Sequence, residues 1–189
     1  MPFGVKRWLS CGLLGLSAAG LGCGDDPESA FTGLWLTQQL TFNPSGCQTE
    51  GPARTVGVPF LGIAPVEGEP GRLQVKFCRS VDNCRARLFE DDPEPRSFPD
   101  FTDGVGAFAA FAEPEDGICV DGFFREDRLL RDGERLTIET RIWDLPIYPA
   151  REGVCGPELA EAVARAVPCA ELVVITATRS LGLDELRPE

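Results

Sequence analysis

The clearest indication of the fold is the segment Thr32-Gly33-Leu34-Trp35-Leu36-Thr37-Gln38-Gln39-Leu40-Thr41-Phe42. Two sets of side chains alternate along it: Leu34, Leu36, Leu40 and Phe42 against Trp35, Thr37, Gln39 and Thr41. A period of two places every second side chain on the same face of an extended backbone. The stretch therefore predicts a half-buried β-strand at the start of the domain.

The same alternation recurs along the chain. Residues 72–77 and 136–142 show it clearly, and further strands are predicted at 55–63, 84–89, 106–112, 117–125 and 171–179. Asp132-Gly133, between two apolar runs, predicts a tight hairpin because glycine tolerates positive φ. Residues 104–112, where small side chains mix with Phe108 and Phe111, are interpreted as a packed central strand, with close approach of a ligand or of another backbone segment as the alternative.

One helix is predicted, near the C-terminus. Pro157 suits its first turn and Pro168 ends it, while Leu159 and Val163 recur on one face. Strands at short intervals, joined by connections rich in proline and glycine, predict a mainly β fold: an antiparallel barrel or sandwich with this one short helix. No internal repeat is evident, and residues 31–182 are predicted to form a single β-domain, followed by a frayed tail at 183–189.

The N-terminal segment reads as a targeting signal. Lys6 and Arg7 precede an apolar stretch at 8–21, which is too short to span a bilayer core that needs about 20 residues. The run Ala19-Gly20-Leu21-Gly22-Cys23 resembles the lipobox of bacterial lipoproteins, although that family usually has leucine one position earlier than Leu21.

The lipoprotein resemblance implies that residues 1–22 are a signal peptide and that Cys23 is lipidated with acyl chains such as palmitate. Residues 23–30 would then be a tether, and the domain would sit in the bacterial cell envelope, held to the periplasmic or surface face of a membrane. A plain secretory signal cut nearby is the alternative. It would leave the reasoning about the domain unchanged.

The remaining cysteines predict disulfides. After Cys11 in the signal and Cys23, six are left, an even number in an exported domain: Cys47, Cys78, Cys84, Cys119, Cys155 and Cys169. Six cysteines allow 15 pairings. Local spacing favours Cys78–Cys84 across a hairpin and Cys155–Cys169 at the two ends of the helix, which leaves Cys47–Cys119. A zinc site is disfavoured because the chain has no histidine and no CxxC pair.

Charge and composition exclude some functions. The chain carries 30 acidic against 18 basic residues, a net charge of −12, and removing Lys6 and Arg7 with the signal makes it more negative. Such a surface repels nucleic acid. Without histidine there is no Ser-His-Asp or Cys-His arrangement, and no phosphate-binding glycine loop appears, so we expect no enzyme activity, no cofactor and no metal. The acidic stretch from Glu90 to Glu94 lacks the spacing of a calcium loop and is interpreted as a solvated connection.

The first strand carries Gly33-Leu34-Trp35, a G-x-W that resembles the opening motif of lipocalins. In that family the tryptophan plugs the closed end of the barrel and an arginine near the end of a late strand packs over it. The resemblance implies this part for Arg179. The family's Thr-Asp-Tyr loop is absent, since the only tyrosine is Tyr148. A core or strand-end tryptophan is the alternative interpretation of Trp35.

Two functions remain. The lipocalin resemblance implies binding of a small apolar or amphipathic ligand by the inward-facing apolar side chains of a barrel. The alternative is an envelope interaction module that docks a protein through exposed loops such as 90–103. A hydrolase built on paired carboxylates is a distant third, because nothing in the sequence brings two acids together.

Overall fold

The computed structural model describes residues 30–47, 51–54, 57–89, 98–112, 118–149 and 155–187. In chain order its elements are β1 (Gly33–Asn43), β2 (Ala53–Arg54), β3 (Phe60–Pro65), β4 (Arg72–Cys78), α2 (Val81–Phe89), β5 (Phe101–Thr102), β6 (Val105–Ala112), β7 (Ile118–Asp132), β8 (Arg135–Leu145), β9 (Tyr148–Pro149), α3 (Pro157–Ala164), β10 (Glu171–Leu181) and α4 (Leu183–Leu186).

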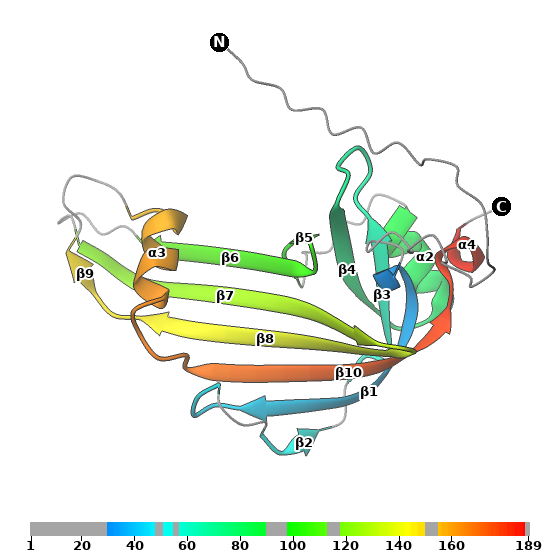
Figure 1. The fold of residues 1–189 in the computed structure, drawn as a ribbon, viewed down its shortest axis with the longest axis horizontal. Helices are drawn as coiled ribbons and strands as arrows, with labels where there is room; N and C mark the ends of the chain where they lie inside the picture. Colours follow the sequence, from blue (N-terminus) through cyan, green and yellow to red (C-terminus); the bar gives the residue numbers. More distant parts are fainter. Residues whose placement is uncertain are drawn as a thin grey trace, which may run out of the picture.

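The strands close into an antiparallel barrel (Figure 1). The wall follows the order β1-β3-β4-β5-β6-β7-β8-β10, and β10 pairs back with β1. The two short strands lie at the margins, β2 against β1 and β9 against β7. Neighbours in the wall are thus close in sequence, apart from the pair that closes the ring. This confirms the predicted mainly β, antiparallel and disulfide-stapled fold.

The hairpin between β7 and β8 lies where it was predicted, but its two turn residues come one position later than Asp132-Gly133. Asp132 and Arg135 form the last pair of the ladder, so Gly133 and Glu134 are the two turn residues. Gly133 adopts a φ of 57°, a value that glycine reaches without the steric cost that a Cβ would add. The turn therefore sets the register of the longest pairing in the barrel.

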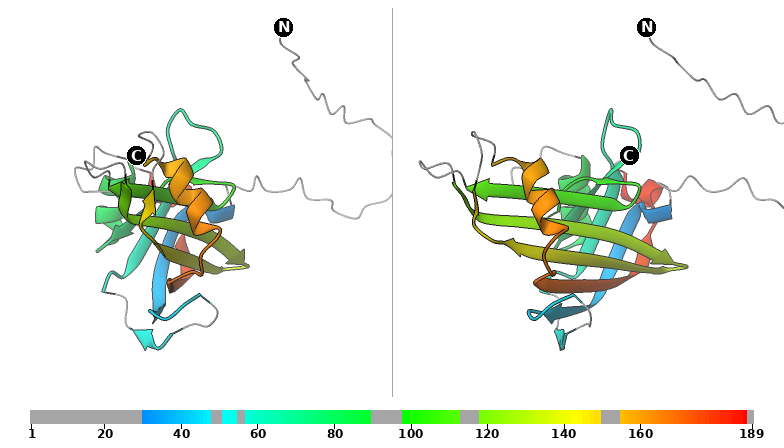
Figure 2. Two further views of the ribbon diagram at one scale, coloured as in Figure 1. Left: turned by 90° about the vertical axis from the view of Figure 1, so that its left-hand side faces the viewer. Right: turned by 60° about the vertical axis from the view of Figure 1, so that its left-hand side comes forward.

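One half of the barrel is filled by side chains. Trp35 belongs to this core and has no exposed surface. The rest of the cluster comes from β3, β4, β5 and the residues before it, β7, β8 and β10: Leu61, Ile63, Leu73, Val75, Phe98, Phe101, Leu129, Leu136, Ile138, Ile175 and Ala177. Figure 2 shows the wall curving around this volume. We call this half the closed end.

Two further clusters lie outside the barrel, under the helices. At the closed end α2 and α4 cover Leu34 and Ala64 on the outer face. Over the other half α3 crosses β6, β7 and β8 and buries Phe124 and Leu145 (Figure 1). Leu186 of α4 is fully buried. Residues 183–186 are therefore part of the folded domain, and the frayed tail predicted there was wrong.

The strand predicted at 84–89 is helix α2. Ser80 caps it: its hydroxyl accepts a hydrogen bond from the Asn83 backbone N–H at 3.1 Å. The buried residues are Cys84 and Leu88, four positions apart as on one helix face. The chain thus has more short helices than the one predicted. That one, now α3, begins at Pro157 as expected.

Only one of the three predicted disulfide pairings is correct. Cys78–Cys84 is confirmed, but it joins the end of β4 to the first turn of α2 instead of crossing a hairpin. The other bonds are Cys47–Cys169 and Cys119–Cys155. The predicted Cys155–Cys169 bond was wrong because an eight-residue helix is about 12 Å long, whereas a disulfide needs Cα atoms within about 7 Å. With that pairing excluded, Cys47–Cys119 fails as well.

Candidate functional site at the open end of the barrel

The strands of the barrel wall do not all extend equally far. Strand β3 follows β1 only as far as the pair Leu36 and Phe60, whereas β1 continues to Asn43 alongside β10. Strand β5 meets β6 only at Val105, so the described part of β6 beyond that residue pairs with β7 alone. Strands β6, β7, β8, β10 and β1 therefore extend past β3, β4 and β5 (Figure 1). We call this extension the open end.

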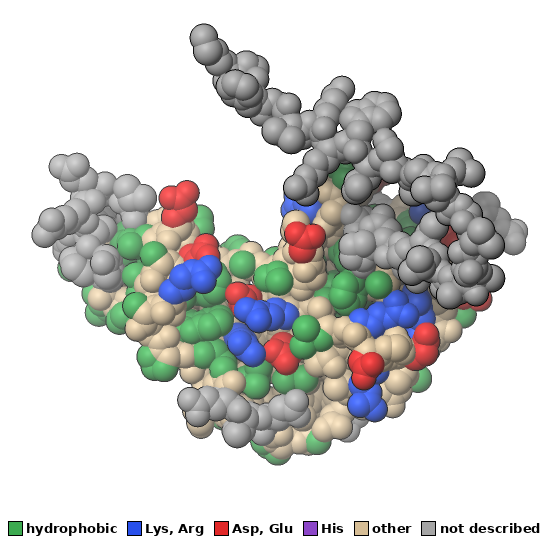
Figure 3. All heavy atoms as spheres, in the orientation of Figure 1, with side chains coloured by type: hydrophobic (Ala, Val, Ile, Leu, Met, Phe, Trp, Pro, Cys, Tyr) green, Lys and Arg blue, Asp and Glu red, His purple; other side chains and the backbone are tan. Residues whose placement is uncertain are grey.

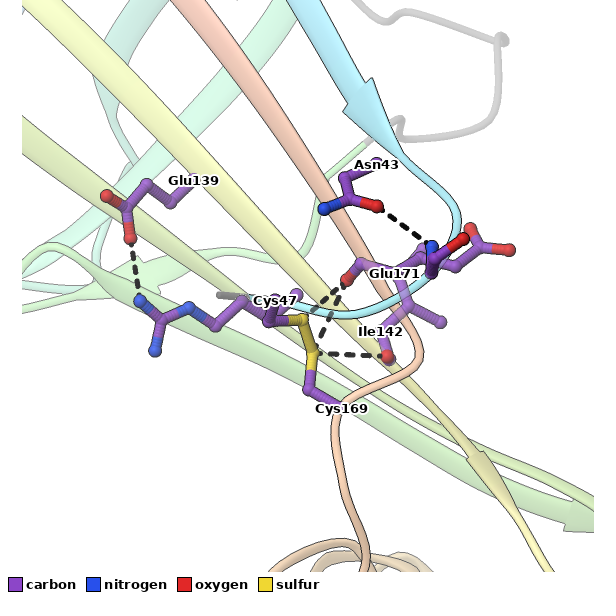
Figure 4. Close-up of a disulfide and its surroundings, with 8 residues drawn as sticks. Asn43, Cys47, Glu139, Ile142, Cys169 and Glu171 are labelled. Carbon is purple, nitrogen blue, oxygen red and sulfur yellow. Dashed lines mark hydrogen bonds and ion pairs between the residues drawn. A yellow bond between two sulfur atoms is a disulfide. The ribbon is translucent and has the colours of Figure 1, made fainter. Parts of the chain in front are cut away.

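Two disulfides bound the open end. Cys47–Cys169 links the chain just after β1 to the chain just before β10 (Figure 4). Cys119–Cys155 links the start of β7 to the segment before α3. Both bonds lie where strands of the extension begin or end, so they restrain this part of the wall without the support of β3 and β4.

The inner face of the open end follows from strand alternation. Leu129 and Ile138 oppose each other in the closed-end core. Stepping by two along both strands keeps to that face. The successive pairs are Asp127 with Thr140, Arg125 with Ile142, and Phe123 with Asp144. On β6, Phe108 is opposite Arg125 and Ala110 opposite Phe123. We call Phe108, Ala110, Phe123, Arg125 and Ile142 the open-end face.

Two aromatic rings on this face are exposed. Phe108 keeps 52% of its surface accessible and Phe123 keeps 36%, and their ring centroids are 5.4 Å apart. Phe124, one residue on, points to the opposite face and is buried under α3. The packed central strand predicted for 104–112 is thus wrong at Phe108. The alternative that this strand lets a ligand approach agrees with the exposure.

A buried ion pair separates the open-end face from the core. Asp127 has no exposed surface. The Arg125 Nη2 donates to its Oδ1 at 2.9 Å, and Nε lies 2.7 Å from Oδ2, in an orientation that makes no hydrogen bond. The Thr140 hydroxyl also donates to Oδ1. Oδ1 therefore accepts two hydrogen bonds, while Oδ2 is held only by its ion-pair distance to the guanidinium.

Arg125 also packs against the core. Its guanidinium carbon lies 5.1 Å from the centroid of the Phe98 ring, close enough for a cation–π contact. Phe98 in turn stacks at 5.1 Å on Phe77 and at 6.3 Å on Phe101. The side chain of Arg125 stays 26% exposed. Its guanidinium is thus fixed by Asp127 and Phe98, with one edge toward the open end.

Asp127 should leave a signature in the pH dependence of stability. Burial raises the pKa of its carboxyl, against the lowering effect of the hydrogen bonds from Arg125 and Thr140. The folded protein therefore holds this proton to higher pH than the unfolded chain does. Its contribution to the free energy of unfolding falls as pH rises from about 3.9 through the raised pKa, and is constant above it.

Asp127→Asn removes this titration. We expect the difference in Tm, wild type minus variant, to fall as the pH rises above about 4 and to become constant once the pH has passed the raised pKa. Thermal unfolding followed by circular dichroism across this range measures it. A difference that grows with rising pH contradicts the assignment of burial as the dominant cause.

The closed end contains the pair that the lipocalin resemblance implies. The guanidinium carbon of Arg179 lies 5.4 Å from the Trp35 ring centroid, and its Nη2 donates to the Thr32 carbonyl at 2.6 Å. The Trp35 indole N–H donates to the Phe31 carbonyl at 2.8 Å. Gly33 has φ 131°, and a Cβ there would lie 2.5 Å from the Leu181 carbonyl oxygen. The G-x-W thus has a structural role at the closed end.

The other predicted sites can be placed only in part. Cys23 and the stretch Glu90–Glu94 lie outside the described residues. Later in the chain, within the described residues, Asp100 pairs with Arg72 at 2.6 Å. Within the described ranges, no three His, Cys, Asp or Glu side chains gather closely enough to hold a metal ion. No helix there is long and apolar enough to cross a membrane.

Comparisons give this chain no relatives: it matches no known protein family, no curated protein and no solved structure.

Sequence reasoning missed Arg125, Asp127 and Thr140. A signal was present. Counting by two from Leu129 places Asp127 and Arg125 on the same face as the apolar core. Charged side chains that face a protein core are rare unless they form an ion pair. The run Arg125-Glu126-Asp127-Arg128 hides this, because four consecutive charges resemble a solvated loop.

Proposed function

We propose that the domain binds a small, largely apolar molecule against the open-end face. The observation that carries the proposal is the exposure of Phe108 and Phe123 on the inner side of a barrel wall. Aromatic side chains left in water on a concave face gain free energy when an apolar ligand covers them, roughly 25 cal/mol per Å². Ligand sites commonly lie in the mouths of β-barrels.

The outer face offers less to a ligand. Figure 3 shows positive and negative side chains interspersed over it. Two of its ion pairs lie on β7 and β8: Arg128 with Glu126 at 2.7 Å, and Arg141 with Glu139 at 3.1 Å. Interspersed ion pairs of this kind are typical of a solvated surface. The two exposed aromatic rings of β6 and β7, Phe108 and Phe123, lie on the inner face, whereas the exposed apolar side chains of the outer face, such as Val105 and Leu130, are aliphatic.

We also propose that the domain is tethered to a bacterial envelope membrane through Cys23. The lipobox-like run and the three disulfides both fit an exported protein. Mass spectrometry of the mature N-terminus tests this part, since lipidated Cys23 carries the added mass of its acyl chains. Ligand binding at the open end does not depend on the result.

The ligand proposal predicts binding of an uncharged apolar dye. Titration of the purified protein with Nile red should give saturable fluorescence at one site per chain. Phe108→Ser with Phe123→Ser should weaken binding at least tenfold, because it removes both rings from the face. Equilibrium fluorescence titration measures the change.

Leu130→Ser is the matched control, because Leu130 is an exposed apolar residue on the outer face of the same strand, at 46% exposure. It should leave dye binding unchanged. Two outcomes contradict the proposal: no saturable binding by the wild type, or a concentration-dependent dimer that buries Phe108 and Phe123 against a second copy. Analytical ultracentrifugation identifies the second.

A further inference from the structure

We infer that the open-end face selects a ligand whose polar end is an uncharged hydrogen-bond acceptor, such as an ester or ketone carbonyl, bound at Nη1 of Arg125, and that Asp127 makes the same site reject anions. This inference rests on the proposed function and adds the chemical class of the ligand. It follows from the donors of Arg125, from the charges around it and from the apolar wall beside it.

Arg125 has a donor to spare. A guanidinium carries five N–H groups, and here Nε and Nη2 face Asp127. Nη1 makes no hydrogen bond within the described structure and is not among the buried polar atoms that lack a partner, so water reaches it. On β6, Phe108 is directly opposite Arg125. The spare donor therefore sits beside the exposed aromatic wall.

The charge of Arg125 is already compensated. Oδ1 of Asp127 accepts hydrogen bonds from Arg125 and Thr140, and Oδ2 lies 2.7 Å from Nε of Arg125, so the carboxylate and the guanidinium form an ion pair. Asp144 lies on the same face, two positions beyond Ile142, and is exposed. The chain as a whole has a net charge of −12. A ligand carboxylate would thus meet two nearby carboxylates against one guanidinium, and like charges in a partly desolvated site repel.

A purely apolar ligand is also disfavoured. Covering the open-end face with hydrocarbon would exclude water from Nη1 and leave its N–H groups without an acceptor, which weakens binding. A neutral carbonyl oxygen supplies the acceptor and adds no charge. An apolar chain against Phe108 and Phe123, ending in an uncharged carbonyl at Arg125, meets both requirements.

Two compounds of equal chain length test this inference by displacement of Nile red at pH 8: methyl decanoate, which is uncharged, and decanoate, which is ionised. We expect the wild type to bind the ester at least tenfold more tightly. Asp127→Asn keeps the shape of the side chain but leaves Arg125 uncompensated. It should raise the affinity for decanoate at least tenfold and change that for the ester less than threefold.

Glu126→Gln is the matched control. It removes one negative charge from the next position of β7, on the outer face, where Glu126 pairs with Arg128. It should leave the preference unchanged. Circular dichroism verifies that each variant is folded, and the wild-type comparison of the two compounds stands without either variant.

The outcomes separate the two proposals. Decanoate binding as tightly as the ester to the wild type overturns the inference. The inference is also overturned if Asp127→Asn does not raise the affinity for decanoate. It is overturned as well if Glu126→Gln raises that affinity equally, because net charge would then be the cause. Nile red binding that depends on Phe108 but resists displacement by both compounds overturns the inference and leaves the proposed function standing. Absence of dye binding overturns the proposed function itself.

Discussion

Trp35→Ala should lower the free energy of unfolding by about 3–5 kcal/mol, the usual cost of removing a large buried aromatic side chain. Trp35 has no exposed surface and touches the core contributed by the other strands of the closed end. Its indole also ties the first strand to the Phe31 carbonyl, and its ring lies under Arg179. The variant loses packing, a hydrogen bond and the cation–π contact together.

Urea unfolding followed by far-UV circular dichroism measures this loss, since removing Trp35 also removes a fluorophore. Trp35→Phe is the graded control. It retains most of the buried ring but not the N–H, so we expect a loss of about 1–2 kcal/mol. A Trp35→Ala variant within 1 kcal/mol of the wild type would contradict the placement of Trp35 in the core.

Removing the Cys47–Cys169 bond should have the second large effect. The two cysteines are 122 residues apart in sequence. In the chain-entropy model, a loop of that length stabilises the fold by about 5 kcal/mol, by restricting the unfolded chain. The bond also restrains the open end at the start of β10. Changing both cysteines to alanine should therefore lower the urea midpoint strongly.

Cys78–Cys84 is the internal comparison. Its sequence separation is 6, and the same model gives it a contribution of about 2 kcal/mol. Paired alanine variants of the two bonds, unfolded in urea under identical conditions, give the order. The account requires the long-loop variant to be the less stable of the two, and the reverse order refutes the assignment of Cys47 to Cys169.

Much of the fold was predictable because alternation is a property of the local sequence. The strands around Leu34, Leu73 and Leu136, and the position of the β7–β8 hairpin, are all recognisable from a few neighbouring residues. Which side chains of β1 face the barrel interior was harder to predict. Trp35 points into the barrel and Leu34 out of it, yet both are fully buried, because α2 and α4 cover the outside.

The failures have a common physical cause: they depend on contacts distant in sequence. In 84–89, Cys84, Ala86 and Leu88 alternate with two arginines, which imitates a strand. The same apolar residues also fit a helix, and packing of Leu88 beside Gly62, where a Cβ would lie 2.8 Å from Leu88 Cδ1, goes with that choice. The disulfide pairing likewise depends on which strand ends meet in space.

The candidate site was the least predictable part. Exposure of Phe108 goes with the pairing of β6, which meets β5 only at Val105 and beyond it pairs with β7 alone in the described part. Which strands are neighbours cannot be known before the topology is known. Pairing of Arg125 with Asp127 follows from the phase of β7. Which side chains of β7 face the interior can be inferred by counting from Leu129, but only once the register of the β7–β8 hairpin is known.

The most direct test of the ligand site is a two-dimensional NMR titration of the ¹⁵N-labelled protein with Nile red. We expect the largest backbone shifts at Phe108, Ala110, Phe123, Arg125 and Ile142, with little change around Trp35 or in α2 and α4. Shifts concentrated on the outer face or under the helices, or no saturable shifts at all, would contradict the proposed ligand site.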